Sequence, residues 1–410
     1  MKIKAIILSL CILGLFGLSG CNRPADSENN SIALQGSASI SKDNETKNNE
    51  IEKEITISPE VKEAAEQALE IANQYKELYV DAEKHKEEYF PYDMVLSQES
   101  IDEIENQFIT DGYPIIDSDE IYPDYLANSE SLYDFWEAVI RNKEAEQWLI
   151  SVSSTGGLHF RQLTSCNGVR QYTAVYVEWN EKNEPYIDDT EQRDILDWDL
   201  TEAGHFYFQI LPTDRHYDDY SMIRLEPVKK KLYDLNTQYV IPIGYQSNNL
   251  FTSNWDSSDF GELCLNDLFE FLYRVKYHDY YNENGGSIPA DVFEHVIKPY
   301  FDISWDEFRE RCLYDEANQC YPWQEIGADN VTYYPALEPD VIEKHDNNDG
   351  TFTLVVDVRC NDNKEDRLFT HEVTIRPLED GSYQYVSNQI TYKGEYELPE
   401  YYPRVSQRGE

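Results

Sequence analysis

The chain has 410 residues, with 34 lysines and arginines against 79 aspartates and glutamates, and its formal net charge at pH 7 is −45. This balance excludes nucleic-acid binding by phosphate neutralisation, because such binding needs clustered basic side chains. Hydrophobic residues make up 40% of the chain and aromatic residues 13%, so wholesale disorder is also excluded. The length predicts two or three domains.

The first 20 residues have the pattern of a secretory signal peptide. Lys2 and Lys4 precede an apolar run over residues 5–18, which is shorter than the roughly 20 residues that span a bilayer. The run ends in Leu18-Ser19-Gly20-Cys21, which resembles the lipobox of bacterial lipoproteins. The resemblance implies cleavage before Cys21 and a diacylglycerol on its thiol, and two acyl chains anchor a protein where one binds only reversibly. The alternative is an ordinary signal peptide with Cys21 unmodified.

Residues 22–57 form a predicted tether. They are rich in Asn, Ser, Lys, Glu and Asp, contain no aromatic residue, and show neither helical nor strand periodicity. A flexible chain of this length spans about 30 to 36 Å on average. We therefore expect a protein attached to the extracytoplasmic face of a cell membrane, on a Gram-positive type of surface, with envelope partners within reach.

Helices are predicted in the part that follows. Ser58-Pro59-Glu60 combines an N-cap, a proline at the first helical position and an acid in the first turn. The apolar spacing predicts that this helix runs to about residue 88. Two more helices are predicted over 98–110 and 132–146, the second with Ser131 as its N-cap.

From Trp148 onward the apolar period changes to two, which indicates strands joined by short turns. An antiparallel meander is the expected result. Residues 188–199 are interpreted as one more strand or an exposed loop, and we place a domain boundary near residue 255. The strands are predicted at 148–152, 158–163, 170–179 and 205–211, with a further short one at 222–226.

The final third repeats this plan of helices followed by strands. Helices are predicted over 265–275 and from Pro289 to Phe301, and Ser304 and Glu307 form a capping box that starts another. Alternating strands are predicted at 352–358, 371–375 and 383–390, with Asp-Gly turns at Gly350 and Gly381. Helices first and a curved antiparallel meander afterwards is the layout of the nuclear-transport-factor-two-like and cystatin-like α+β folds.

Four stretches of this part look like an uncharacterised family of Clostridia-type lipoproteins. The resemblance covers roughly residues 240–395. It implies a cellular location and a fold, but no activity and no catalytic residue. The stretches are Ile288-Pro289-Ala290-Asp291-Val292-Phe293-Glu294, Asp349-Gly350-Thr351, Phe369-Thr370-His371 and Gly381-Ser382-Tyr383-Gln384-Tyr385-Val386-Ser387-Asn388.

The predicted fold is therefore α+β, with two modules that each place helices before an antiparallel meander. The predicted divisions are a signal peptide at 1–20, a lipidated disordered tether at 21–57, α+β domains at 58–254 and 255–395, and a flexible tail at 396–410.

Five cysteines remain once Cys11 leaves with the signal peptide and Cys21 is acylated: Cys166, Cys264, Cys312, Cys320 and Cys360. Only Cys312 and Cys320 are close enough in sequence to suggest a disulfide. The alternative is that all five are reduced, small apolar side chains. The sequence has no Cys and His residues at the spacing typical of a zinc site, and no cofactor is expected.

Common phosphate, dinucleotide, metalloprotease and serine-hydrolase motifs are missing from the sequence as well. Residues 346–350 read as a hairpin turn, since an EF-hand register would put His345 and Val356 at carboxylate positions. Asp197-Trp198-Asp199 and the cluster at 214–219, which contains His216, could hold a cation weakly or supply an acid/base pair. In so acidic a chain such clusters also arise by chance.

Tyrosine is abundant, with 32 residues, and exposed rings can stack on sugars or anchor interfaces. The sets Tyr277, Tyr280 and Tyr281, or Tyr217 and Tyr220, could therefore line a recognition surface. The alternative for each is a core position.

The sequence favours a membrane-anchored lipoprotein that acts as a non-enzymatic binding or interaction module. Its expected partners are the membrane, through the lipid on Cys21, and an unknown envelope protein or glycan. One alternative is a surface hydrolase of glycan or peptide that uses carboxylates. Another is a solute-binding lipoprotein of a transporter, which is weakened because repeated βαβ patterns are not found.

Overall fold

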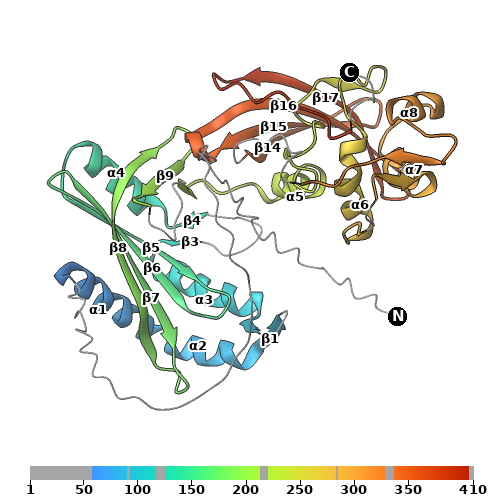
Figure 1. Cartoon of the computed structure of the whole chain (residues 1–410). Coiled ribbons are helices and arrows are strands. Elements are labelled where there is room, and N and C mark those ends of the chain that lie inside the picture. Colours follow the sequence, from blue (N-terminus) through green and yellow to red (C-terminus); the bar gives the residue numbers. More distant parts are fainter. Residues whose placement is uncertain are drawn as a thin grey trace, which may run out of the picture. The chain divides into compact units, whose positions relative to one another are not determined.

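The computed structural model describes residues 58–89, 93–116, 125–212, 220–282, 285–327 and 337–405. Residues Thr56–Glu410 form one compact unit. Within the described ranges the protein is a mixture of α-helices and mainly antiparallel β-sheets (Figure 1). The predicted combination of helices and antiparallel strands is confirmed. The tether and the signal peptide lie outside the described residues.

The first helix begins as the sequence predicts. Helix α1 spans Pro59–Gln74, and the side chain of Ser58 accepts a hydrogen bond from the Val61 amide at 3.2 Å. The prediction that this helix reaches residue 88 is wrong. After α2 (Lys76–Ala82) and a 3-10 turn, the chain becomes strand β1 (Lys86–Tyr89) and pairs with β2 (Asp93–Leu96). Backbone pairing with a second strand thus overrides local helix propensity.

The next two helices are present, one with shifted ends. Helix α3 spans Gln98–Thr110, as predicted. Helix α4 spans Glu130–Ile140, so Ser131 lies inside the first turn instead of capping it, and its hydroxyl accepts a hydrogen bond from Gln147. The helix stops because Asn142 takes a left-handed conformation, with φ of 53°.

An eight-stranded sheet follows, with the order β10-β9-β8-β7-β6-β5-β3-β4. Neighbours from β5 to β10 are consecutive in sequence and antiparallel, so the predicted meander is confirmed, and residues 188–199 are strand. The strand β3 pairs with β5 in parallel. The strands are β3 (Ile115–Ile116), β4 (Leu126–Ala127), β5 (Ala145–Val152), β6 (Leu158–Cys166), β7 (Val169–Trp179), β8 (Pro185–Leu200), β9 (His205–Ile210) and β10 (Ser221–Arg224).

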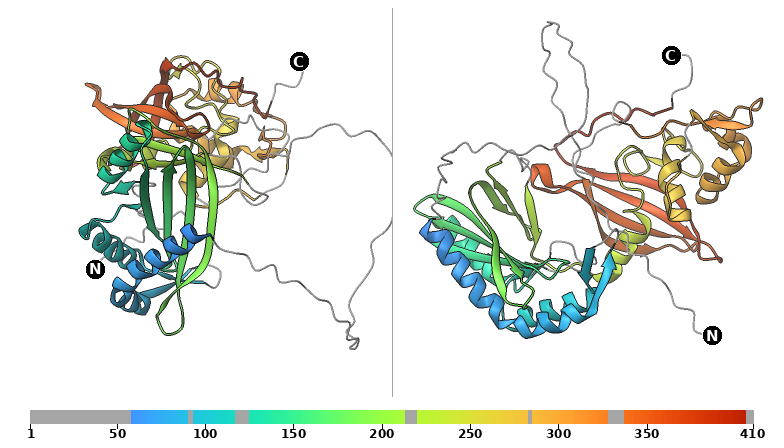
Figure 2. Two further views of the ribbon diagram at one scale, coloured as in Figure 1. Left: turned by 90° about the vertical axis from the view of Figure 1, so that its left-hand side faces the viewer. Right: turned by 60° about the horizontal axis from the view of Figure 1, so that its bottom comes forward.

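Both faces of this sheet carry apolar cores. Successive side chains of a strand point to opposite faces; Ile150 accordingly packs in a core with α1, α2 and α3, whereas Leu149 packs in another with α4. Figure 2 shows α1 and α2, in blue, running along the green strands, and α1 contacts β7 and β8. The small buried residues Ala64, Ala68 and Ala72 let α1 approach the sheet closely.

The rest of the chain contains four more α-helices among the described residues and a five-stranded sheet of order β11-β17-β16-β15-β14. Its strands β15, β16 and β17 confirm the three predicted ones, and Gly350 and Gly381 form the predicted turns with φ of 84° and 88°. The helices are α5 (Lys230–Tyr239), α6 (Phe269–Tyr277), α7 (Ala290–Ile297) and α8 (Trp305–Arg311). The strands are β11 (Trp255–Asp256), β14 (Leu337–Asp346), β15 (Phe352–Cys360), β16 (Glu365–Pro377) and β17 (Tyr383–Lys393), besides the separate pair β12 (Ser287–Pro289) and β13 (Cys320–Pro322).

Half of the predicted capping box on α8 is present. The side chain of Ser304 accepts a hydrogen bond from the Glu307 amide at 3.2 Å. The carboxylate of Glu307 accepts instead from Arg311, one turn further along the helix. None of the helices in the described ranges is long and apolar enough to cross a membrane.

Polar contacts join the two sheets. Arg224 of β10 pairs with Asp340 of β14 at 3.0 Å, and His205 of β9 lies 2.6 Å from Asp366 of β16. The guanidinium of Arg359, itself 4% exposed, also reaches Asp340. The acids of this region are therefore matched by basic partners.

A buried polar chain crosses the core of the five-stranded sheet. The amide nitrogen of Asn388 donates to the carbonyls of Phe251 and Ser253, so its oxygen accepts from His371 Nδ1 at 2.7 Å. Nε2 of His371 then accepts from the Tyr245 hydroxyl at 2.8 Å. This arrangement requires neutral His371, and burial lowers its pKa from 6.5 to about 4.

The state of His371 predicts a pH dependence of stability. Its pKa is lower in the folded protein than in the unfolded chain, so the contribution is complete above pH 6.5 and is lost as the pH falls towards 4. The free energy of unfolding should fall by up to about 1.4 kcal/mol per pH unit in this window from this residue alone. Urea denaturation of the wild-type protein and of His371→Gln between pH 7.5 and 4.5 gives the slope of the unfolding free energy against pH for each protein. The difference between the two slopes measures the contribution of His371.

The variant His345→Gln is the matched control, because His345 is exposed. It should keep the wild-type slope. Equal slopes for the wild-type protein and His371→Gln would contradict the prediction.

Candidate functional site

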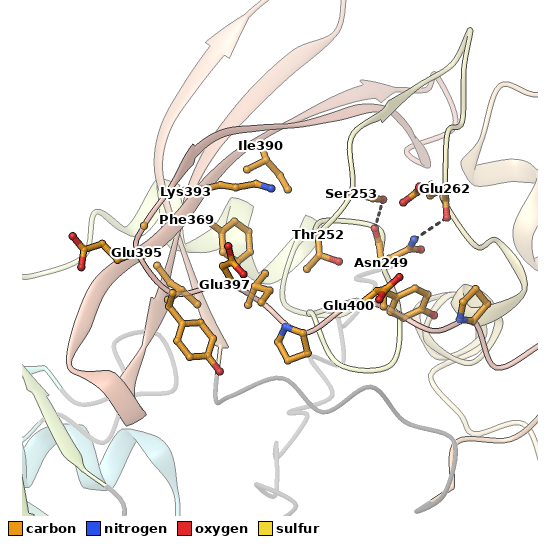
Figure 3. Close-up of a pocket in the computed structure, with 17 residues that line it drawn as sticks. Asn249, Thr252, Ser253, Glu262, Phe369, Ile390, Lys393, Glu395, Glu397 and Glu400 are labelled. Atoms are coloured by element: carbon orange, nitrogen blue, oxygen red, sulfur yellow. Dashed lines mark hydrogen bonds between the residues drawn. The ribbon is translucent and has the colours of Figure 1, made fainter.

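An open groove of about 730 Å³ lies beside the end of β17 (Figure 3). Its lining comes from the loop before β11, from β16 and β17, and from the segment that follows β17. The lining residues are Asn249, Thr252, Ser253, Glu262, Leu368, Phe369, Ile390, Lys393, Gly394, Glu395, Tyr396, Glu397, Leu398, Pro399, Glu400, Tyr401 and Pro403.

One wall of the groove is residues 394–403, which we call the strap. It has no regular secondary structure. At its start the Gly394 amide donates to the Leu368 carbonyl at 2.8 Å, and a Cβ at this position would lie 2.8 Å from the same oxygen. Only glycine therefore lets the chain pass so close to β16. Leu398 packs against the core between the two ends of the strap.

The far end of the strap is fixed by a buried ion pair. The side chains of Arg404 and Asp267 are 1% and 2% exposed, and Arg404 Nε lies 3.3 Å from the Asp267 carboxylate. Arg404 also donates to the Gln324 carbonyl at 2.8 Å, and Tyr401 donates its hydroxyl to Asp267. A flexible tail was expected from residue 396; these contacts instead hold residues 401–404 against the protein, while residues 406–410 lie outside the described ranges.

The opposite wall is the loop at residues 249–253. The side chain of Asn249 donates to the Glu262 carbonyl at 2.9 Å and accepts from the Cys264 amide at 3.0 Å, while the Ser253 hydroxyl donates to the Asn249 carbonyl at 2.7 Å. The hydroxyl of Thr252 is different, since it is buried with no hydrogen-bond partner among the described residues. A buried hydroxyl without a partner costs about 1 to 3 kcal/mol, and burial closes this oxygen off from a group bound in the groove.

The groove combines an apolar floor with an acidic rim. Phe369 and Leu368 are buried in its floor. In Figure 3 the carboxylates of Glu397 and Glu400 lie towards the side that carries Glu262, whereas that of Glu395 points away. These side chains can accept hydrogen bonds and attract cations, while the floor can hold apolar groups.

The predicted acidic cluster at Asp197 has a structural role. Burial by itself would raise the pKa of Asp197, but hydrogen bonds from Lys364 at 2.6 Å and Tyr220 at 2.8 Å lower the pKa overall. The carboxylate of Asp199 accepts from the Leu200 amide. Asp197 and Asp199 therefore make local and inter-sheet contacts away from the groove lining. The second cluster at 214–219, with His216 and Tyr217, lies outside the described residues.

Of the tyrosines singled out in the sequence, Tyr220, Tyr277, Tyr280 and Tyr281 lie in the described ranges, and none of these four lines the groove. Tyr281 packs against Phe269 and Trp323, which is the core alternative. Tyr280 is 67% exposed and Tyr277 is 44% exposed.

The two tyrosines of the groove, Tyr396 and Tyr401, were missed because they lie in the predicted tail. The run Tyr396-Glu397-Leu398-Pro399-Glu400-Tyr401 is rich in aromatic and apolar residues. That composition is unusual for a flexible tail and was the available signal.

The described cysteines form no disulfide. Cys166, Cys264, Cys312, Cys320 and Cys360 all carry free thiols, with Cys312 buried, so the suggested bridge between Cys312 and Cys320 is not formed here. No group of three His, Cys, Asp or Glu side chains among the described residues is placed to hold a metal ion. Residues 346–350 form the expected hairpin turn, in which the Asp349 carboxylate accepts from the Thr351 amide.

The buried ion pair of the strap predicts a large effect of Arg404→Ala. The substitution leaves Asp267 buried without its guanidinium, which typically costs about 3 to 5 kcal/mol of unfolding free energy. Urea denaturation measures the loss. Arg367→Ala is the control, since that exposed arginine only covers the ring of Tyr392, and it should cost no more than about 1 kcal/mol. Equal stability of Arg404→Ala and the wild-type protein would contradict this account of the strap.

Comparison with known proteins identifies a family over most of the chain. Residues 61–404 match the model of a family of unknown function, DUF6070. No curated protein and no solved structure matches the chain. The match extends from α1 through the strap to Arg404 and so includes the whole groove. The chain therefore belongs to DUF6070, a family of unknown function.

Proposed function

We propose that the protein is a membrane-anchored extracytoplasmic lipoprotein that binds a ligand or partner and carries out no catalysis. The observation that carries the binding role is the groove of about 730 Å³ beside β17, with its apolar floor and acidic rim. A cavity of this size with few convergent polar groups is the usual form of a ligand site.

The lining chemistry favours binding over catalysis by a nucleophile. Among the described residues the lining contains neither histidine nor cysteine, and the Ser253 hydroxyl donates to a backbone carbonyl instead of to a base. An activated serine needs an adjacent general base. The groove therefore offers recognition groups without the partners that acyl transfer requires.

The anchor is supported by the sequence alone. Leu18-Ser19-Gly20-Cys21 closes an apolar run in the way that a lipobox does. Lipid on Cys21 and the tether at residues 22–57 would hold the folded unit near the membrane, within about 30 to 36 Å on average. As part of the same proposal, residues 255–395, with α6 to α8 before β14 to β17, form a second α+β module of the nuclear-transport-factor-two-like or cystatin-like kind.

The lipid anchor is tested by labelling with an alkyne palmitate analogue in bacteria that express the protein. The wild-type protein should take up the label and sediment with membranes, and Cys21→Ser should lose both properties. Cys11→Ser should behave as the wild-type protein, because Cys11 lies in the removed signal peptide. Label and membrane association that survive in Cys21→Ser would refute the anchor.

The binding role is tested by photocrosslinking on intact cells, with benzoylphenylalanine in place of Tyr396 or, as a control, Tyr186. The two tyrosines are 40% and 42% exposed, but only Tyr396 lines the groove. A discrete adduct should form from position 396 and not from position 186. The same adducts from both positions, or none from position 396, would contradict a binding role of the groove.

A further inference from the structure

The charges around the groove are unevenly distributed. Glu262, Glu397 and Glu400 stand around its interior, and Lys393 is the one basic residue in the described lining. Ligands that carry positive charge gain from this arrangement, whereas anionic ligands are repelled. A cationic group on the ligand is therefore favoured.

The floor adds an apolar requirement. Phe369 is 2% exposed and Leu368 is 1% exposed, and Ile390 and Leu398 are partly buried against the same core. Apolar groups that bind here leave water, which favours association roughly in proportion to the area buried. A simple inorganic cation cannot use this surface.

The polar side chains of the wall at residues 249–253 are not open to a ligand. The Thr252 hydroxyl is buried away from solvent, although it has no hydrogen-bond partner among the described residues. The other polar side chains of this wall, Asn249 and Ser253, already have partners within the protein.

We propose that the groove takes a cationic peptide segment in an extended conformation. Its Lys or Arg side chains would pair with Glu397 and Glu400, and its apolar side chains would contact Ile390 and Leu398. Side chains of an extended peptide alternate between two sides, which matches a rim of carboxylates over an apolar floor. This inference rests on the proposed binding function and names the class of ligand.

The overall charge of −45 attracts any cation, so the test must separate groove carboxylates from general acidity. Glu63 and Glu70 allow this, because both are exposed on α1 and neither lines the groove. Glu63→Gln/Glu70→Gln removes two negative charges from the protein and leaves the groove intact.

The probe is a fluorescent octapeptide of alternating lysine and valine, with matched peptides that carry glutamine or glutamate in place of lysine. Fluorescence anisotropy with the full-length protein in non-ionic detergent measures their affinities. The lysine peptide should bind at least tenfold more tightly than the glutamine peptide. Glu397→Gln/Glu400→Gln should weaken it roughly tenfold, since each exposed pair contributes up to about fivefold. Glu63→Gln/Glu70→Gln should change its affinity less than twofold.

Two results would overturn the inference. If Glu63→Gln/Glu70→Gln weakens the lysine peptide as much as Glu397→Gln/Glu400→Gln does, general acidity explains the binding. If the glutamine peptide binds as tightly as the lysine peptide and blocks the photocrosslink from position 396, the ligand class is wrong while the binding role stands. The binding role itself fails only if position 396 gives no specific crosslink.

Discussion

The buried ion pair between Asp267 and Arg404 is the contact on which the groove depends. Both side chains are withdrawn from water, and Arg404 also pairs with Glu270 at 2.6 Å, so removing the guanidinium would leave Asp267 as an uncompensated charge in the protein interior. Since Arg404 follows the strap directly, the pair turns a segment without secondary structure into a wall of fixed position. The close passage of Gly394 past Leu368 holds the other end. The groove therefore depends on two anchors, Gly394 and Arg404. Both are far in sequence from the loop at residues 249–253, which forms the opposite wall.

The polar chain from Tyr245 through His371 to Asn388 fixes the opposite wall. Asn388 holds the carbonyls of Phe251 and Ser253, on either side of Thr252, and its orientation follows from the two hydrogen bonds that it donates. Because neutral His371 completes this chain, the shape of the groove is linked to the protonation state of one buried histidine.

The acidic residues of the protein fall into two groups. Asp197, Asp340 and Asp366 pair with Lys364, Arg224 and His205, and these pairs connect β8, β9 and β10 with β14 and β16. These paired charges stabilise the contact between the two sheets. Glu397 and Glu400 are exposed on the strap, where a carboxylate stays available to a ligand. Net charge alone does not distinguish these groups, because the difference depends on which basic residues lie nearby.

The sequence by itself determined the starts of α1 and α8, the turns at Gly350 and Gly381, and the strands from β15 to β17, because caps, left-handed glycines and alternating apolar residues act over a few residues. Tertiary structure decided what depended on distant partners. Strand β14 was not predicted because it is an edge strand that contains Pro339 and buries Val341. The strap was not recognised because its order comes from Asp267, more than a hundred residues earlier in the chain. The groove also could not be predicted from the sequence, because its floor, loop and strap meet only after the sheet has formed.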